Sequence, residues 1–151
     1  MKTLDKEVFP SSLYLFLRHI ESEFTNKKIL DCGAGGPFPN IALFKKLGFD
    51  VYGIEISEDS IKKTEKFAEE YDIELNIQKG DMRKIPFRDN FFHFMYSYNS
   101  IFHLSKADSG IAIDEMFRVL KKGGLLFVNF LSVEDSLYKS GEEVNPGEFL
   151  Q

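Results

Sequence analysis

The segment 28–36 joins a short apolar run, an acid and a cluster of glycines. Its apolar residues at 29 and 30 favour a buried strand, Asp31 follows them, and Gly33 and Gly35 come shortly afterwards. Because glycine lacks a Cβ, Gly33 and Gly35 can adopt positive φ and bring the backbone close to a bulky ligand. Two interpretations stay open for this segment alone: an ordinary strand-to-helix turn and a ligand-binding turn.

Strand and helix patterns alternate along the rest of the chain. Short runs rich in β-branched and aromatic residues predict strands, and apolar residues at steps of three or four predict helices. The further expected strands are 49–56, 73–78, 91–98 and 125–131, and the expected helices are 11–24, 39–47, 57–71 and 106–122. This alternation requires crossover connections, so it predicts an α/β fold with a doubly wound, mostly parallel sheet.

Local signals indicate where several of these helices begin and end. Ser57 is a typical N-cap residue, Gly48 is expected to end the helix before it, and Gly123-Gly124 are expected to cap the helix 106–122. The leading helix 11–24 either covers the sheet or forms a lid over a ligand. From Ser132 onwards the residues show no clear period, which predicts a loop or a disordered segment.

Composition limits the class of protein. A chain of 151 residues, 43% of them hydrophobic, is sufficient for a single domain, 1–151, with a substantial core. The net charge of -5, with acids and bases interspersed, argues against nucleic acid as a partner. Cys32 is the only cysteine, which excludes an internal disulfide and a cysteine-cluster metal site, and we expect no metal. Without a signal-like N-terminus or a membrane-length apolar run, we expect a cytoplasmic protein with no membrane contact.

Polar residues stand at the carboxyl ends of four expected strands. Asp31, Glu55, Asp81 and the stretch 97–99 occupy these positions. In open parallel sheets, ligands bind outside the carboxyl ends of the strands, at the point where the strand order reverses. We therefore expect these residues to gather in one ligand-binding crevice.

Four segments together carry a family resemblance. They are the glycine segment 31–36, Glu55 at the end of the second strand, Gly80-Asp81-Met82 after the third, and 117–124 before the fifth. This set resembles class I S-adenosylmethionine-dependent methyltransferases over roughly residues 28–131. The resemblance implies a Rossmann-like core, S-adenosylmethionine as cofactor with S-adenosylhomocysteine as product, and methyl transfer to a small-molecule acceptor.

The resemblance also implies roles near the methionine part of the cofactor. Gly33 and Gly35, with Ala34 between them, would pass under that part. Asp31 would bind nearby, directly or through water. Tyr98 would lie beside the sulfonium.

A second group of residues would hold the adenosine part. Glu55 would accept hydrogen bonds from both ribose hydroxyls, which suits the two oxygens of a carboxylate. Asp81 would accept from the adenine amino group, and Met82 and Ile56 would pack on the ring.

Two departures from the family pattern stand out. Pro37 occupies the place where many members have a third glycine, although Gly36 precedes it. The two strands that usually follow the fifth are not evident, so we expect a C-terminally truncated chain. The fifth strand would then be an open apolar edge through which copies of the chain could associate. This edge supports an alternative function, a non-catalytic cofactor-binding or interaction module.

A nicotinamide dinucleotide-binding domain is a further alternative, because that fold also combines a glycine turn with an acid about twenty residues later. It predicts a third glycine at position 38, where the chain has Phe38, and it gives no role to Asp81.

Methyl transfer from a sulfonium is an in-line displacement that depends on alignment and on exclusion of water. It requires a general base only when the nucleophile must lose a proton. Asn99 and His103, just beyond the fourth strand, are the candidates for the substrate pocket. For His103 a purely structural role is the other interpretation.

Overall fold

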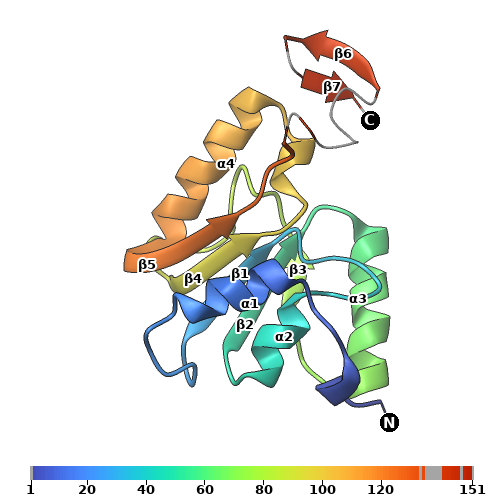
Figure 1. Ribbon diagram of the computed structural model, residues 1–151, viewed down its shortest axis with the longest axis vertical. Coiled ribbons are helices and arrows are strands. Elements are labelled where there is room, and N and C mark those ends of the chain that lie inside the picture. The colour runs from blue at the N-terminus through green and yellow to red at the C-terminus, as the bar shows by residue number, and fades with distance from the viewer. Residues whose placement is uncertain (1, 133, 135–140, 147, 151) are drawn as a thin grey trace.

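A five-stranded parallel sheet lies at the centre of the protein, with helices on both faces (Figure 1). The computed structural model describes residues 2–132, 134, 141–146 and 148–150. The strands of the sheet are β1 (Lys28–Cys32), β2 (Asp50–Glu55), β3 (Ile77–Lys79), β4 (Phe92–Ser97) and β5 (Leu120–Val128). Their order is β3-β2-β1-β4-β5, and every neighbouring pair is parallel. The expected α/β fold class is confirmed.

The helices form two layers because successive residues of a strand point to opposite faces of the sheet. The helices are α1 (Ser11–Arg18), α2 (Ile41–Lys46), α3 (Glu58–Tyr71) and α4 (Lys106–Val119), with short 3₁₀ turns η1 (Leu4–Lys6) and η2 (Ile101–His103). Ile29 of β1 packs in a core with residues of α1, α2 and α3. Its neighbour Leu30 packs in a second core with residues of η2 and α4. The sheet is therefore covered on both sides.

The predicted helix starts agree with the structure to within two residues, as do the predicted ends of the helices 39–47 and 57–71. The Ser57 hydroxyl accepts the backbone N–H of Ser60 at 3.2 Å and caps α3. Gly48 follows α2 with a φ of 92°, a conformation that glycine adopts without strain. Lys106 is the first residue of α4, as expected.

The leading helix is shorter than predicted, because α1 ends at Arg18 instead of continuing to Phe24. Ile20 is still buried, and the Phe24 ring stacks on Phe49 with centroids 4.7 Å apart. Asn26 then adopts a φ of 60° before β1 begins. The apolar residues at helical spacing therefore do pack in the core, but the last of them, Ile20 and Phe24, lie in the loop after α1.

The third strand begins later than predicted, at Ile77 instead of Ile73. Asn76 has a left-handed φ of 47°, and its side-chain amide donates to the carbonyl oxygen of Val51 at 3.0 Å. Extended pairing with β2 can start only after that residue. Ile73 and Leu75 contribute to the core from the connecting segment.

Gly123-Gly124 do not cap α4, because the helix ends at Val119 and the two glycines lie within β5. The pairing of β4 with β5 moves from Phe92↔Leu120 to Phe94↔Leu125, which leaves a bulge at 121–124. A Cβ on Gly124 would lie 2.6 Å from the carbonyl oxygen of His93. Glycine is needed here because two backbones approach closely.

The end of the chain also differs from the prediction. β5 ends at Val128 instead of Leu131, and β6 (Glu142–Asn145) pairs antiparallel with β7 (Glu148–Leu150). The hairpin lies beyond the carboxyl end of β5, away from the sheet (Figure 1). The expected loop is wrong for these strands but agrees with residues 132, 134, 141 and 146, and residues 133, 135–140, 147 and 151 lie outside the described part. Within the described part, no helix has the length and apolar character required to cross a bilayer.

Candidate functional site

A cleft of about 350 Å³ lies beside the carboxyl ends of the central strands. The strand order reverses between β1 and β4, so this is the position where open α/β sheets bind ligands. The cleft is lined by Gly33, Ile54, Glu55, Ile56, Ser60, Gly80, Asp81, Met82, Ser100, His103 and Leu104. Six of these are sequence-predicted site residues: Gly33, Glu55, Ile56, Asp81, Met82 and His103.

The glycine turn after β1 packs too tightly for side chains at two positions. Gly33 has a φ of 98°, its N–H donates to the carbonyl oxygen of Ile54 at 2.9 Å, and a Cβ on it would overlap the Ser100 side chain. A Cβ on Gly35 would lie 2.5 Å from Cγ of Glu55 and 2.6 Å from Cβ of Ser60. Each glycine therefore allows a close approach of the turn to another segment that lines the cleft.

Glu55 is held in place by two backbone amides at the end of β2. Its Oε2 accepts the N–H of Gly35 at 3.0 Å, and its Oε1 accepts the N–H of Ser57 at 2.9 Å. An ionised carboxylate offers about four acceptor positions, so each oxygen keeps capacity for one more donor. The arrangement suits two neighbouring hydroxyl groups of a ligand.

Thr64 also supports the glycine turn, and the sequence analysis did not single it out. The residue is 1% exposed, and its hydroxyl accepts the N–H of Gly36 at 3.0 Å. The same hydroxyl lies within donating distance of the carbonyl oxygens of Gly36 and Ser60. A signal was present, because Thr64 falls three residues from both Ile61 and Phe67 on the inward face of α3.

Apolar side chains form part of the cleft next to Asp81. Ile56 is 61% exposed, which is high for a large aliphatic side chain, and Met82 is half-buried. Both line the cleft. A flat apolar ring bound there would cover the exposed Ile56 surface.

Asp81 is engaged by Arg83. The backbone N–H of Arg83 donates to Oδ1 of Asp81 at 2.8 Å, and Nη2 of its guanidinium donates to Oδ2 at 2.7 Å. The hydrogen bonds from Arg83 hold the pKa of the Asp81 carboxyl below its usual value. Asp81 therefore presents an ionised acceptor to the cleft.

Asp31 does not line the cleft. It is 3% exposed, and its Oδ2 accepts a hydrogen bond from the Tyr96 hydroxyl at 2.7 Å. Burial raises the pKa of Asp31 from 3.8 to about 7, although the Tyr96 hydrogen bond opposes that rise. The buried carboxyl therefore binds a proton more readily than an exposed aspartate does.

Replacing Asp31 with asparagine is expected to change the pH dependence of stability. Because the folded-state pKa is raised from 3.8 to about 7, the carboxyl contributes stability below pH 3.8 that is lost as the pH rises to 7. The loss is of the order of 4 kcal/mol. Asp31→Asn removes this loss and keeps an acceptor for Tyr96.

Urea denaturation at pH 5 and pH 8 tests this expectation. The natural chain should lose stability relative to Asp31→Asn when the pH is raised from 5 to 8, so its unfolding free energy minus that of the variant should be lower at pH 8. A difference that is the same at both would contradict the raised pKa.

Four other predicted residues also lie outside the cleft lining. Ala34 is 2% exposed, Gly35 packs against Glu55, and Tyr98 is half-buried beside the core under α1 and α2. Asn99 accepts a hydrogen bond from Asn129 at 2.6 Å and donates its backbone N–H to the same side chain at 2.7 Å. Their roles in ligand binding stay predictions.

His103 does line the cleft, at the end of η2, and its side chain is exposed. Its ring lies 4.7 Å from the ring of Phe102. Among the described residues, no three His, Cys, Asp or Glu side chains are grouped as metal ligands would be.

A glycine turn, a fixed carboxylate at the end of β2 and an acid after β3 are together typical of α/β domains that bind a nucleoside-containing ligand. Comparison with known proteins identifies the family. The family described as "Methyltransferase domain" matches residues 30–128, which is more than half of the chain. The chain belongs to this family, and the resemblance found in the sequence is confirmed. S-adenosylmethionine is the methyl donor that the family implies.

Individual relatives agree with this assignment. The chain is 32% identical to sterol 24-C-methyltransferase ERG6 of Saccharomyces cerevisiae over 64% of its own length and 25% of that enzyme. It is 33% identical to 24-methylenesterol C-methyltransferase 3 of Arabidopsis thaliana over 78% of its length and 32% of that enzyme. The chain thus spans about a quarter to a third of these relatives.

A solved structure supports the fold independently. The PH0226 protein from Pyrococcus horikoshii OT3 superposes with a TM-score of 0.69 and 29% sequence identity. The match covers 76% of this chain and 54% of that protein.

Proposed function

We propose that the protein is an S-adenosylmethionine-dependent methyltransferase with a small-molecule acceptor. The observation that carries this proposal is the Glu55 carboxylate, fixed by two backbone amides inside a cleft at the switch point of a methyltransferase-family sheet. Each carboxylate oxygen accepts one hydrogen bond from a backbone N–H at about 3 Å and can accept one more, so the two oxygens together suit a vicinal diol. A ribose supplies that diol.

The adenine ring would lie on one side of this ribose position. Ile56 and Met82 supply apolar surface for the ring, and the ionised Asp81 supplies an acceptor for its amino group. The exposed Ile56 supports this assignment, because a bound ring would remove its side chain from water.

The methionine part of the cofactor would lie over the glycine turn. Gly33 lines the cleft there, and Ala34 and Gly35 continue the turn beneath it. Asp31 lies near the end of β1, and Tyr98 directly follows β4. We propose that both affect the methionine part of the cofactor indirectly, through a water molecule or through the shape of the pocket.

The acceptor would approach from the side of η2, where Ser100, His103 and Leu104 line the cleft. Methyl transfer needs the nucleophile in line with the sulfonium and water excluded. His103 could accept a proton where the acceptor must lose one, and Asn99 lies on the same connection. The relatives are named for sterol substrates, which supports a small-molecule acceptor.

Transfer of a labelled methyl group from S-adenosylmethionine to a panel of sterols and other small molecules tests the proposal. We expect transfer by the natural chain and none by Glu55→Ala. Cofactor binding without transfer to any acceptor in the panel would instead favour the alternative function, a non-catalytic binding module.

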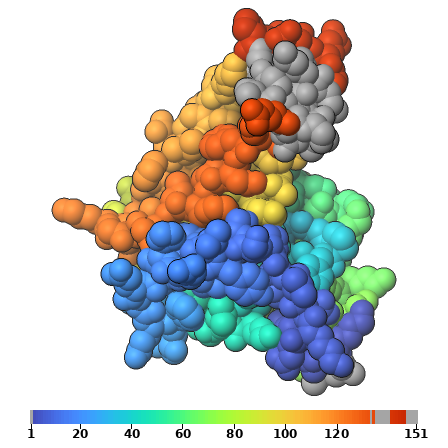
Figure 2. All heavy atoms as spheres, viewed as in Figure 1, coloured from blue at the N-terminus to red at the C-terminus, as the bar shows by residue number. Residues whose placement is uncertain are grey.

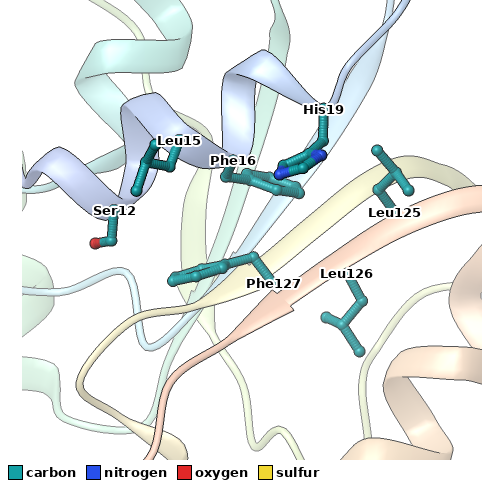
Figure 3. A pocket seen from close by; sticks show the side chains of 7 residues that line it. All are labelled: Ser12, Leu15, Phe16, His19, Leu125, Leu126 and Phe127. Carbon is teal, nitrogen blue, oxygen red and sulfur yellow. The ribbon is translucent and has the colours of Figure 1, made fainter.

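We also propose that the protein associates with a second copy of itself through β5. Among the described residues β5 pairs with β4 alone, so it forms one edge of the sheet. Leu125, Leu126 and Phe127 are only half-buried, and β5 lies at the surface beside α1 (Figure 2). An apolar groove of about 260 Å³ runs between the two, with Phe16 and Phe127 facing each other (Figure 3).

Sedimentation tests this association. Two identical edges can pair antiparallel about a two-fold axis, so we expect a dimer for the natural chain and a monomer for Leu125→Lys. Val144→Lys, at an exposed apolar residue of β6, is the matched control and should remain dimeric. A monomeric natural chain at a concentration of hundreds of micromolar would overturn the proposal.

A further inference from the structure

Arg83 forms a charged bridge at the rim of the cleft. Its Nη2 lies 2.7 Å from Oδ2 of Asp81, and its Nε lies 3.1 Å from both oxygens of that carboxylate. Its Nη1 donates to Oδ2 of Asp108 at 3.1 Å. One guanidinium thus connects an acid after β3 with an acid in the first turn of α4.

The bridge fixes the direction of the Asp81 carboxylate. Besides the guanidinium contacts, the backbone N–H of Arg83 donates to Oδ1 of Asp81, and the N–H of Lys84 donates to the Asp81 carbonyl oxygen at 3.0 Å. These bonds close a tight turn, and three N–H groups of Arg83 occupy most of the about four acceptor positions of the carboxylate. The remaining acceptor capacity is available to a donor in the cleft.

The bridge also connects the two walls of the cleft. Asp108 belongs to the helix whose N-cap is Ser105, and His103 and Leu104 on the cleft wall come directly before that cap. Arg83 therefore links the β3–β4 connection to the η2–α4 connection.

Stability alone gives little reason for this arrangement. The Arg83, Asp81 and Asp108 side chains are 39%, 33% and 35% exposed. Ion pairs at such exposed positions typically contribute less than about 1 kcal/mol. The geometric effect on Asp81 is the more specific consequence.

We propose that Arg83 is a positioning residue that aims the Asp81 carboxylate at the exocyclic amino group of adenine, with Asp108 as its anchor. This inference rests on the proposed function, because it requires an adenosine-containing cofactor in the cleft. It makes Arg83 a determinant of base specificity, acting through Asp81 without touching the ligand.

Isothermal titration with S-adenosylhomocysteine and S-inosylhomocysteine tests the inference, because these ligands differ in an amino group or a carbonyl at one ring carbon and in the hydrogen on the neighbouring ring nitrogen. The natural chain should prefer the adenosyl ligand. Arg83→Gln should reduce this preference about tenfold, as expected for one misdirected hydrogen bond to a charged group. Asp108→Asn should reduce it less. Arg88→Gln is the matched control, since that exposed guanidinium lies over the Phe91 ring, 5.0 Å from its centroid.

The outcomes separate this inference from the proposed function. If the natural chain binds neither ligand, the proposed function fails. If the natural chain prefers the adenosyl ligand and Arg83→Gln keeps or increases that preference, the positioning role is wrong. Equal weakening of both ligands would also overturn it, because a purely structural role affects both alike.

Discussion

Replacing Glu55 with alanine is expected to weaken the binding of S-adenosylhomocysteine by at least about 100-fold. The carboxylate would accept two hydrogen bonds from the ribose, and hydrogen bonds to a charged group contribute about 1.5–3 kcal/mol each. The substitution also releases the N–H groups of Gly35 and Ser57, which the carboxylate now holds. The shape of the glycine turn therefore changes together with the loss of the acceptor.

Isothermal titration measures this loss, with Glu58→Ala as the matched control. Glu58 lies three residues further along, and its exposed carboxylate pairs with Lys79. The control should bind within about threefold of the natural chain, since exposed ion pairs contribute little. A similarly small effect for Glu55→Ala would remove the main support for a ribose at this position.

Gly33→Ala is expected to lower the free energy of unfolding by about 3 kcal/mol. Gly33 has a φ of 98°, where alanine is strained, and its new Cβ would overlap the Ser100 side chain. Left-handed strain costs of the order of 1 kcal/mol and overpacking typically adds 1–3 kcal/mol. The variant should also bind the cofactor less tightly, because Gly33 and Ser100 both line the cleft.

Gly48→Ala separates the two costs. Gly48 has a similar φ of 92°, but a Cβ there would have no heavy atom within 4 Å. Urea denaturation should show a loss of about 1 kcal/mol for this control. Ser100→Gly in the Gly33→Ala chain should restore part of the difference. Equal losses at Gly33 and Gly48 would show that the contact with Ser100 is unimportant.

The sequence predicts the part of the site that parallel topology dictates. Glu55 and Asp81 follow two strands of one parallel sheet, so their positions at the same edge follow from the strand pattern. Ser57 marks the start of α3 by its capping chemistry, which is local and therefore readable. These features can be predicted without knowing which distant residues are in contact.

Other features depend on contacts that the local sequence does not specify. Asn76 delays β3 because its side chain reaches Val51, and the glycines at 123–124 form a bulge because His93 lies opposite. Asp31 is buried against Tyr96, 65 residues away, instead of lining the cleft. The alternation of residues along a strand shows that the side chains point to two faces of the sheet, but it does not show whether Asp31 faces the core or the ligand.

The Arg83 bridge is another long-range feature. Its two partners are 2 and 25 residues away, and only the packing of α4 against the sheet brings Asp108 within reach. A motif search that stops at Asp81 and Met82 therefore identifies the acid but not the group that orients it.

Direct titration of the intact chain with S-adenosylhomocysteine and S-adenosylmethionine tests the central claim, that the cleft beside Glu55 holds this cofactor. We expect one site per chain for each ligand, with dissociation constants between about 1 μM and 1 mM, the range typical of enzyme substrates. A natural chain that gives no binding heat and no rise in melting temperature with either ligand at several millimolar would contradict the claim.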